Sequence, residues 1–203
     1  MHRIMPSISL ACWLLMTYSF PAQAITIDLL PTLQEVDVNT PATVDIAISG
    51  LVDSAAPSLS SFDLNIIYDP EMLSFPGLGG VDFGDQLDLF GFGSLRSVDD
   101  SVPGIINLFE LSLDPPDDLN NFQPSTFTLG TLTFDTLLTG VSTLALSLNA
   151  LGDANGDPLA ADLNGAEINT RPTTDIPEPT ILMLFVTGMA GLCWRTLAQP
   201  RQS

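Results

Sequence analysis

The residues that could do chemistry in this chain are almost all carboxylates. Its 203 residues include 24 acidic residues and five basic ones, all arginine, and the formal net charge is −19. The only histidine, His2, and the two cysteines, Cys12 and Cys193, lie near the chain ends. The middle of the chain therefore has no His, Cys or Lys. These missing residue types exclude nucleophile–histidine catalysis, zinc held by Cys or His, and a lysine Schiff base there. A chain this acidic also excludes nucleic acid as a partner.

One acidic stretch has the spacing of a cation-binding loop. Asp153, Asn155 and Asp157 occupy every second position, as the first ligands of a calcium loop do. However, Pro158 replaces the usual glycine, and Asn164 stands where a bidentate glutamate belongs. The alternative is a hairpin turn, for which an Asn-Gly dipeptide is well suited. The sequence favours the turn, predicts no cofactor, and keeps calcium as the alternative.

Short apolar or alternating runs, bounded by Gly, Pro, Asn and Asp, fill the middle of the chain. The sequence predicts nine strands there and no helix of useful length. The expected strands are residues 25–29, 43–49, 62–68, 73–75, 95–98, 105–113, 126–138, 143–148 and 166–169. Residues 77–93 are expected to form a long loop, and residues 114–118 a break. This pattern predicts an all-β domain, an antiparallel two-sheet sandwich or jelly roll.

The expected strand 62–68 separates two faces by strict alternation. Asp63, Asn65 and Ile67 fall on the outward face, opposite a row of apolar side chains. An isoleucine exposed between polar neighbours is typical of an interface anchor. We therefore predict that these three residues belong to a partner-binding face. A solvated face that carries one apolar residue remains the alternative.

The order of motifs resembles that of a cohesin domain, the nine-stranded jelly roll related to carbohydrate-binding modules. Four stretches carry the resemblance: residues 44–51, residues 62–73 with Tyr-Asp-Pro, residues 127–134 before Gly140, and residues 153–165. The loop 77–93 matches no family motif. The resemblance implies a jelly-roll sandwich and a dockerin that docks on the sheet face containing strand 62–68. Cohesin-like domains need not bind dockerin, so an envelope protein or an extracellular polysaccharide is also considered.

Residues 1–24 have the form of a secretory signal peptide. A short positive start that includes Arg3 precedes the largely apolar run 8–20, and Ala22 and Ala24 form a small-x-small cleavage site. The sequence thus predicts export and removal of this segment. The alternative is an N-terminal anchor that stays attached.

The C-terminal end has three parts in order. Pro177-Glu178-Pro179 is followed by the apolar run 181–194, and then by Arg195 and Arg201. As a helix, the run would measure about 21 Å, against a hydrocarbon core of about 30 Å. The arginines would hold the tail on the cytoplasmic side. An ordinary C-terminal anchor helix is the alternative interpretation.

This end resembles the PEP-CTERM sorting signal of Gram-negative bacteria, over residues 177–203. The resemblance implies a transient inner-membrane contact through residues 181–194 and cleavage near the Pro-Glu-Pro motif by the membrane protease exosortase. It also implies delivery to the cell surface or the extracellular matrix of a biofilm. The predicted organisation is a signal peptide (1–24), a cohesin-like domain (25–170), a spacer (171–176) and the sorting signal with its short helix (177–203).

Removal of both ends makes the protein more acidic. Residues 25–175 contain 23 acidic residues and two arginines, Arg96 and Arg171, a formal charge of −21. We expect a non-enzymatic cell-surface or matrix module that binds a protein or polysaccharide partner through a sheet face. One alternative is an acidic structural component of the polysaccharide matrix without a discrete ligand. A more distant alternative is a glycosidase that uses two carboxylates.

Overall fold

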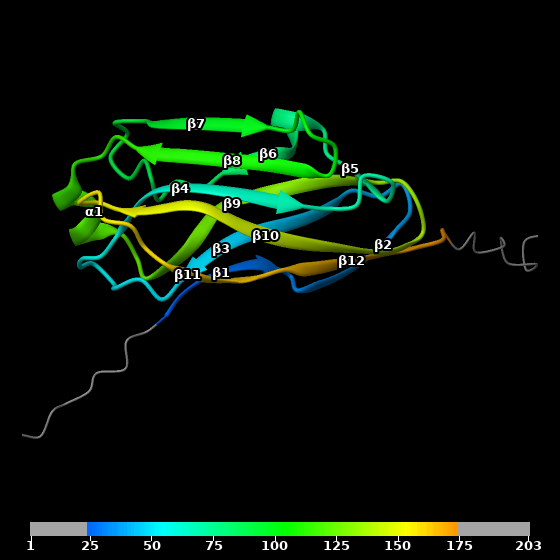
Figure 1. Ribbon diagram of the computed structural model, residues 1–203, viewed down its shortest axis with the longest axis horizontal. Helices are drawn as coiled ribbons and strands as arrows, with labels where there is room; N and C mark the ends of the chain where they lie inside the picture. Colours follow the sequence, from blue (N-terminus) through cyan, green and yellow to red (C-terminus); the bar gives the residue numbers. More distant parts are fainter. Residues whose placement is uncertain (1–23, 174–203) are drawn as a thin grey trace, which may run out of the picture.

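The computed structural model describes residues 24–173. Both predicted terminal signals lie outside the described residues, except for Ala24, and so does the expected apolar run 181–194. Between residues 24 and 173, no helix is long and apolar enough to cross a membrane. The described chain starts and finishes at opposite ends of an elongated molecule (Figure 1).

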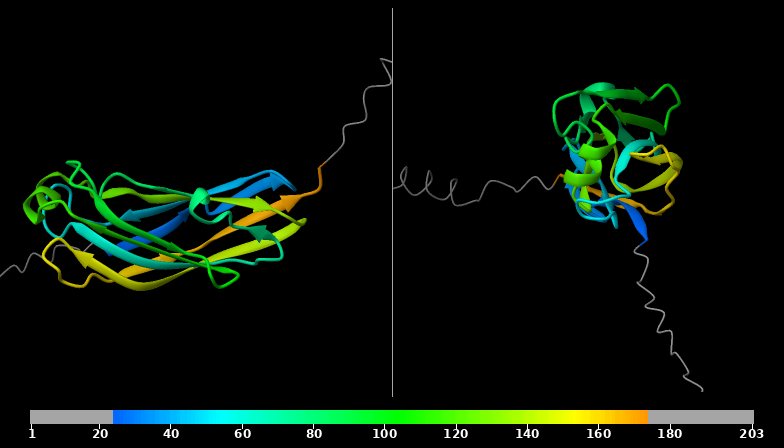
Figure 2. Two further views of the ribbon diagram at one scale, coloured as in Figure 1. Left: turned by 90° about the horizontal axis from the view of Figure 1, so that it is seen from above. Right: turned by 90° about the vertical axis from the view of Figure 1, so that its left-hand side faces the viewer.

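Two six-stranded sheets stack face to face (Figures 1 and 2). The first sheet contains β1 (Ile25–Leu30), β3 (Ala42–Ser49), β5 (Leu73–Ser74), β6 (Val81–Phe83), β9 (Thr126–Thr136) and β11 (Ala161–Asn164). Its order is β11-β1-β3-β9-β5, and β6 also pairs with β9. The second sheet contains β2 (Leu33–Asp37), β4 (Leu59–Ile67), β7 (Ser94–Asp99), β8 (Ile105–Ser112), β10 (Gly140–Asp153) and β12 (Ala166–Arg171). Its order is β2-β12-β10-β4-β8-β7.

The sheets are mixed, which corrects the expectation of a purely antiparallel sandwich. β1 runs parallel to β11, and β2 runs parallel to β12, whereas the other pairs are antiparallel. The chain passes from the first sheet to the second between β1 and β2, at Pro31. Proline cannot donate a hydrogen bond to a strand ladder, so a change of partner is natural there.

The described residues form twelve strands, so the expected count of nine is not confirmed. The nine expected strands are present, and β2, β6 and β11 are the additional ones. None of these three short strands contains a fully buried residue. The sequence signal of a strand comes from burial of every second side chain, so it misses strands that bury none.

A helix forms where a break was expected. α1 (Pro116–Phe122) follows β8, with Pro116 at its first turn and Asp117 and Asp118 beside its N-terminus. Proline in the first turn and acids near the positive end of the dipole both favour a helix start. Only Leu119 of this helix is buried, so it has no apolar periodicity. The expected loop 77–93 likewise contains η1 (Gly77–Gly80) and β6, and Leu87 buries its side chain there.

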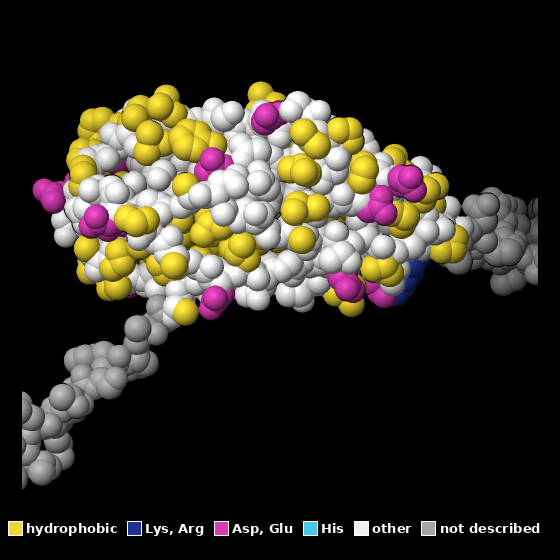
Figure 3. Space-filling view, in the orientation of Figure 1, with side chains coloured by type: hydrophobic (Ala, Val, Ile, Leu, Met, Phe, Trp, Pro, Cys, Tyr) yellow, Lys and Arg dark blue, Asp and Glu magenta, His cyan; other side chains and the backbone are white. Residues whose placement is uncertain are grey.

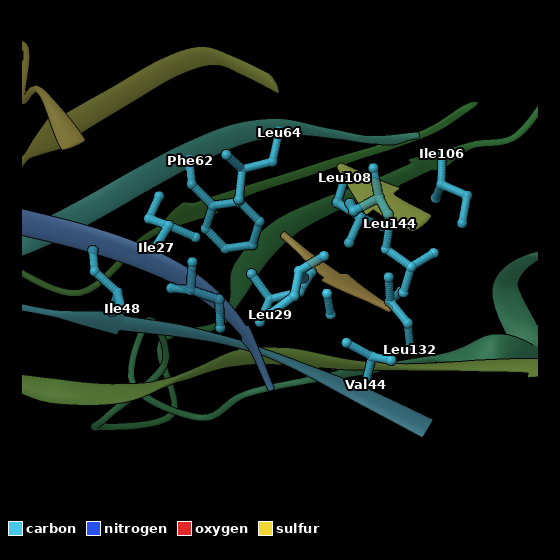
Figure 4. Packing of buried hydrophobic residues seen from close by; sticks show 14 of the residues in the cluster. Ile27, Leu29, Val44, Ile48, Phe62, Leu64, Ile106, Leu108, Leu132 and Leu144 are labelled. Carbon is cyan, nitrogen blue, oxygen red and sulfur yellow. The ribbon is translucent and has the colours of Figure 1, made fainter. Parts of the chain in front are cut away.

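The core lies between the sheets, where inward side chains of β1, β3 and β9 face those of β4, β8 and β10 (Figure 4). The ring of Tyr68 packs inward against Phe134, with 5.3 Å between centroids, as the alternation predicts. Phe75 lies on the same ring at 5.8 Å. A bulge interrupts β9 beside Gly130, because the register between β3 and β9 shifts there.

The expected turn after β10 is built around a buried carboxylate. Asp153 Oδ1 accepts hydrogen bonds from the backbone N–H groups of Asn155 and Asp157, both at 2.8 Å. The side chains of Asn155 and Asp157 are exposed. Carboxylates commonly order turns by bonding nearby backbone N–H groups in this way.

Replacement of Phe134 by alanine should lower the free energy of unfolding by about 3–5 kcal/mol, because a fully buried ring is lost and a cavity remains. The matched control is Phe92→Ala, at a position that is 61% exposed, where the expected change is below about 0.5 kcal/mol. Denaturant unfolding measures both variants. Equal losses would contradict this description of the core.

Replacement of Asp153 by alanine should cost about 1–3 kcal/mol, because two backbone N–H groups lose their acceptor. Asp162→Ala, an exposed position with the same change in charge, is the control. Thermal unfolding should give the same Asp153→Ala loss with added calcium and with a chelator. Calcium stabilisation of the unaltered protein that disappears in Asp153→Ala would instead assign the loop to calcium.

Candidate partner-binding face

Strand β4 lies in the middle of the second sheet, between β8 and β10. Phe62, Leu64 and Ile66 are buried in the core, so Asp63, Asn65 and Ile67 point outward. The alternation expected from the sequence therefore holds from Phe62 to Ile67. Binding by these three residues stays a prediction, and their surroundings say what they could bind.

Asp63 and Asn65 belong to a closed ring of hydrogen bonds that crosses three strands. Asn107 of β8 donates from Nδ2 to Asp63 Oδ1 at 2.6 Å and to Asn65 Oδ1 at 2.9 Å. Asn65 Nδ2 donates to Asn149 Oδ1 at 3.3 Å, and Asn149 Nδ2 donates to Asp63 Oδ1 at 3.0 Å. We call these four side chains the Asn/Asp ring. Each of them restrains two neighbours, so the ring holds its polar groups in fixed positions.

A bulge in β10 brings Asn149 into the ring. Leu148 pairs with Leu64 and Ala150 pairs with Asp63, so Asn149 is an extra residue between two consecutive pairs. A bulge turns a side chain away from the direction that the regular pleat would give it. Here it coincides with the contact between Asn149 and Asp63.

Apolar side chains lie at both ends of the Asn/Asp ring. Ile67 pairs directly with Ile105 of β8, and both are exposed at one end. Phe109 and Leu111 of β8 are half-buried at the other end, opposite Asp63 and Ser61. Figure 3 looks onto this sheet, with its polar middle and flanking hydrophobic side chains. A fixed polar centre between apolar flanks can bind both polar and apolar groups of a partner.

The charge on this part of the sheet is negative. Asp63 is the only charged member of the ring, and Asp99 of β7 is paired in register with Asn107. Backbone and side-chain hydrogen bonds from Ser101 lower the pKa of Asp99, which therefore stays ionised at neutral pH. Both described arginines are engaged with acids elsewhere, Arg96 with Glu110 and Arg171 with Glu35. The face thus suits a partner that brings hydrogen-bond donors or positive charge.

Two ring members could not be found by reading one strand. Asn107 and Asn149 lie more than 40 residues from Asp63 in the chain, and only the pairing register brings them together. Asn107 does stand in an outward position of an expected strand, so its orientation was readable. Asn149 gave no such signal, because the bulge decides where it points.

A hollow lies on the first sheet, away from the Asn/Asp ring. It is an open cleft of about 490 Å³ between β3, β9, β6 and the segment that follows β6. Asp45, Asp82 and Asp85 line it together with Phe83 and Phe127. Thr131 Oγ1 donates to Asp45 Oδ1 at 2.6 Å. Within residues 24–173, no three His, Cys, Asp or Glu side chains are grouped to hold a metal ion.

No family model matches the chain, and no curated protein matches it. Solved cohesin structures do match. A Clostridium thermocellum cohesin, solved in a type I cohesin–dockerin complex, gives a TM-score of 0.58 at 14% identity, covering 73% of this chain and 99% of that one. CaCohA2 from Clostridium acetobutylicum gives 0.57 at 18%, covering 75% and 94%. The non-cellulosomal cohesin of the archaeon Archaeoglobus fulgidus gives 0.55 at 16%, also covering 75% and 94%.

Sequence identities this low establish the fold and nothing finer. The match extends over nearly the whole length of each cohesin, so it is not limited to one hairpin or sheet. The cohesin-like sandwich expected from four short motifs is therefore confirmed. Residues 24–173 have a cohesin-like fold.

Proposed function

We propose that this protein is a non-enzymatic binding module that recognises a partner through the outer face of β4, β8 and β10. The observation that carries the proposal is the Asn/Asp ring, held by four hydrogen bonds of 2.6–3.3 Å and flanked by the exposed Ile67 and Ile105. Groups fixed in place before binding lose little conformational entropy when a partner docks. The face offers apolar anchors on either side of ordered polar groups, so a partner can contact it through both kinds of group.

The proposed partner is a protein, with a dockerin-like module as the first candidate. Cohesins of similar fold were solved in type I cohesin–dockerin complexes. An extracellular polysaccharide is the second candidate. Flat sugar-binding platforms are usually built from exposed Trp and Tyr rings. Residues 24–173 contain no Trp, and their single tyrosine, Tyr68, packs against the core.

We further propose that the module is exported through the inner membrane of a Gram-negative bacterium and sorted by exosortase to the cell surface or matrix. The support lies in the two terminal motifs of the sequence. The described chain also leaves the sandwich at the end of the long axis farthest from α1 (Figure 1). A tether at that end would leave the long sides of the sandwich accessible.

An acidic matrix component without a discrete ligand remains the alternative function. Its support is the formal charge of −21 over residues 25–175, which would bind cations and basic surfaces without selectivity. The two functions differ in their dependence on salt and on single side chains. Generic attraction between exposed charges falls steeply with ionic strength, whereas a shaped face also depends on its apolar anchors.

The double variant Asp63→Ala with Ile67→Ala should weaken saturable partner binding at least tenfold, because it removes the ring's charge and one apolar anchor. The probes are purified extracellular polysaccharide and envelope proteins from the producing strain, titrated against the protein in the form that the cell makes. The control is Asp135→Ala with Leu137→Ala, which removes an exposed acid and a leucine that is 45% exposed, against 42% for Ile67.

The control should bind as the unaltered protein does. Equal binding by both double variants, with an affinity that decreases with salt to the same extent, would contradict the sheet-face proposal. That result would favour the acidic matrix component.

Mass spectrometry of the exported protein tests the proposed processing. The expected N-terminus is Ile25, and the expected C-terminus lies next to Pro177-Glu178-Pro179. Disruption of the exosortase gene should leave the C-terminal segment attached. A mature protein that retains Arg195 and Arg201 in the presence of exosortase would contradict the sorting proposal.

A further inference from the structure

A second apolar surface lies at the end of the sandwich and adjoins the face proposed above where Leu95 pairs with Leu111. It is formed by the segment before β7, by α1, and by the neighbouring ends of β7 and β8. Its members are large hydrophobic side chains that are each 50–61% exposed: Phe90, Phe92, Leu95, Leu113 and Phe122. We call these five residues the end patch. Figure 3 shows hydrophobic side chains gathered at the end of the molecule where α1 lies.

Contacts between the contributing segments bring the members of the end patch close together. The rings of Phe90 and Phe122 meet edge to face, with 5.4 Å between centroids. The backbone N–H of Leu113 donates to Gly93 O at 3.1 Å, next to Phe92 in the chain. Leu95 pairs with Leu111 across β7 and β8. Aromatic and aliphatic groups from three segments are therefore displayed together, although solvent exposure of such groups is unfavourable.

Buried polar groups hold α1 in position beneath the patch. Gln123, which is 1% exposed, accepts a hydrogen bond from Leu59 N and donates to Leu59 O, at 2.5 and 2.9 Å. The same amide donates to Gln86 O at 3.0 Å. One buried side chain thus fastens the helix to β4 and to the segment that carries Phe90. Buried hydrogen bonds of this kind are expensive to break, so Phe122 is displayed on a fixed support.

The segment before β7 is fastened in the same way. Asp114, a buried acid, accepts a hydrogen bond from Leu89 N at 2.6 Å. Asp88 accepts one from Gly93 N at 2.7 Å, which closes the loop around Phe90 and Phe92. The patch is therefore ordered before any partner arrives, which removes an entropic cost from binding.

The end patch has an acidic surround. Asp117 and Asp118 lie in the first turn of α1, and Asp88 lies in the loop that carries Phe90. The nearest described arginine, Arg96, bonds Glu110 Oε1 at 2.7 Å and Gly84 O at 3.1 Å, with its guanidinium 5.1 Å from the centre of the Phe83 ring. Its charge is thus largely engaged at the sheet edge, and the field around the patch is negative.

We propose that the end patch docks a basic amphipathic segment of a partner protein. The apolar side of that segment would cover Phe92, Phe122 and their neighbours, and its Lys or Arg side chains would lie over the surrounding acids. A second copy of this chain would bring the same acids against each other, and an anionic membrane would be repelled likewise. This surface and this partner chemistry are separate from the Asn/Asp ring and do not depend on it.

The test uses the protein in the form that the cell makes and two synthetic peptides of equal charge. One is an amphipathic helix of Leu and Lys, and in the other Ser replaces every Leu. Calorimetric titration should show saturable 1:1 binding of the Leu peptide and at least tenfold weaker binding of the Ser peptide. Equal binding of the two peptides would overturn the proposal, because attraction to charge alone would then account for it.

Variants locate the binding. Phe92→Ser with Phe122→Ser should weaken binding of the Leu peptide at least tenfold, and Asp117→Asn with Asp118→Asn at least threefold. Leu33→Ser with Val141→Ser, at two similarly exposed positions near β12, is the control and should bind normally. Circular dichroism verifies the fold of each variant. Equal binding by the Phe variant and the control would overturn the proposal.

Sedimentation and vesicle binding test whether a second copy of this chain or an anionic membrane covers the end patch instead. The unaltered protein should sediment as a monomer and should not bind vesicles of anionic phospholipid. A concentration-dependent dimer that Phe92→Ser with Phe122→Ser abolishes would assign the patch to a second copy and overturn the proposal. Vesicle binding lost in the same variant would assign it to a membrane, with the same consequence.

Discussion

The two sheets hold together because every second side chain of their central strands is buried between them. Phe62, Leu64 and Ile66 face Ile27, Leu29 and their neighbours, and this contact decides which side chains are left for solvent. A shift of one residue in β4 would bury Asp63 and Asn65 and expose the core row. The outer face is therefore specified by the inner one. The Asn/Asp ring can exist only while the core fixes the register of three adjacent strands.

Much of this architecture is readable in the sequence, and the failures share a cause. Strands such as 43–49 and 62–68 can be recognised in the sequence because they bury alternate residues. β2 and β11 lie at sheet edges, where their side chains are at most partly buried. α1 is held by one leucine and by the amide of Gln123 rather than by an apolar stripe. Elements that are stabilised by backbone and polar contacts leave almost no pattern of hydrophobicity.

The same division applies to the binding surfaces. Asp63, Asn65 and Ile67 could be proposed from one strand, because the period of two places them on a single face. Asn149 needs both the register and the bulge. The end patch combines residues from positions 90 to 122. The sequence alone does not distinguish its exposed phenylalanines from the phenylalanines that are buried in the core. The Asn/Asp ring depends on contacts between strands, and the position of Phe122 depends on the buried amide of Gln123. Both surfaces can therefore be recognised only from the three-dimensional structure.

The parallel pairs at the chain ends have a mechanical consequence. β1 pairs with β11, and β2 pairs with β12. The first and last segments of the described chain are therefore hydrogen-bonded side by side along the molecule. The two ends leave at opposite poles of the long axis (Figure 1). A pulling force between them would act along these strands and load their ladder hydrogen bonds in shear, all at once. A domain pulled from these two ends would resist rupture better in this geometry than if its strands could separate one hydrogen bond at a time.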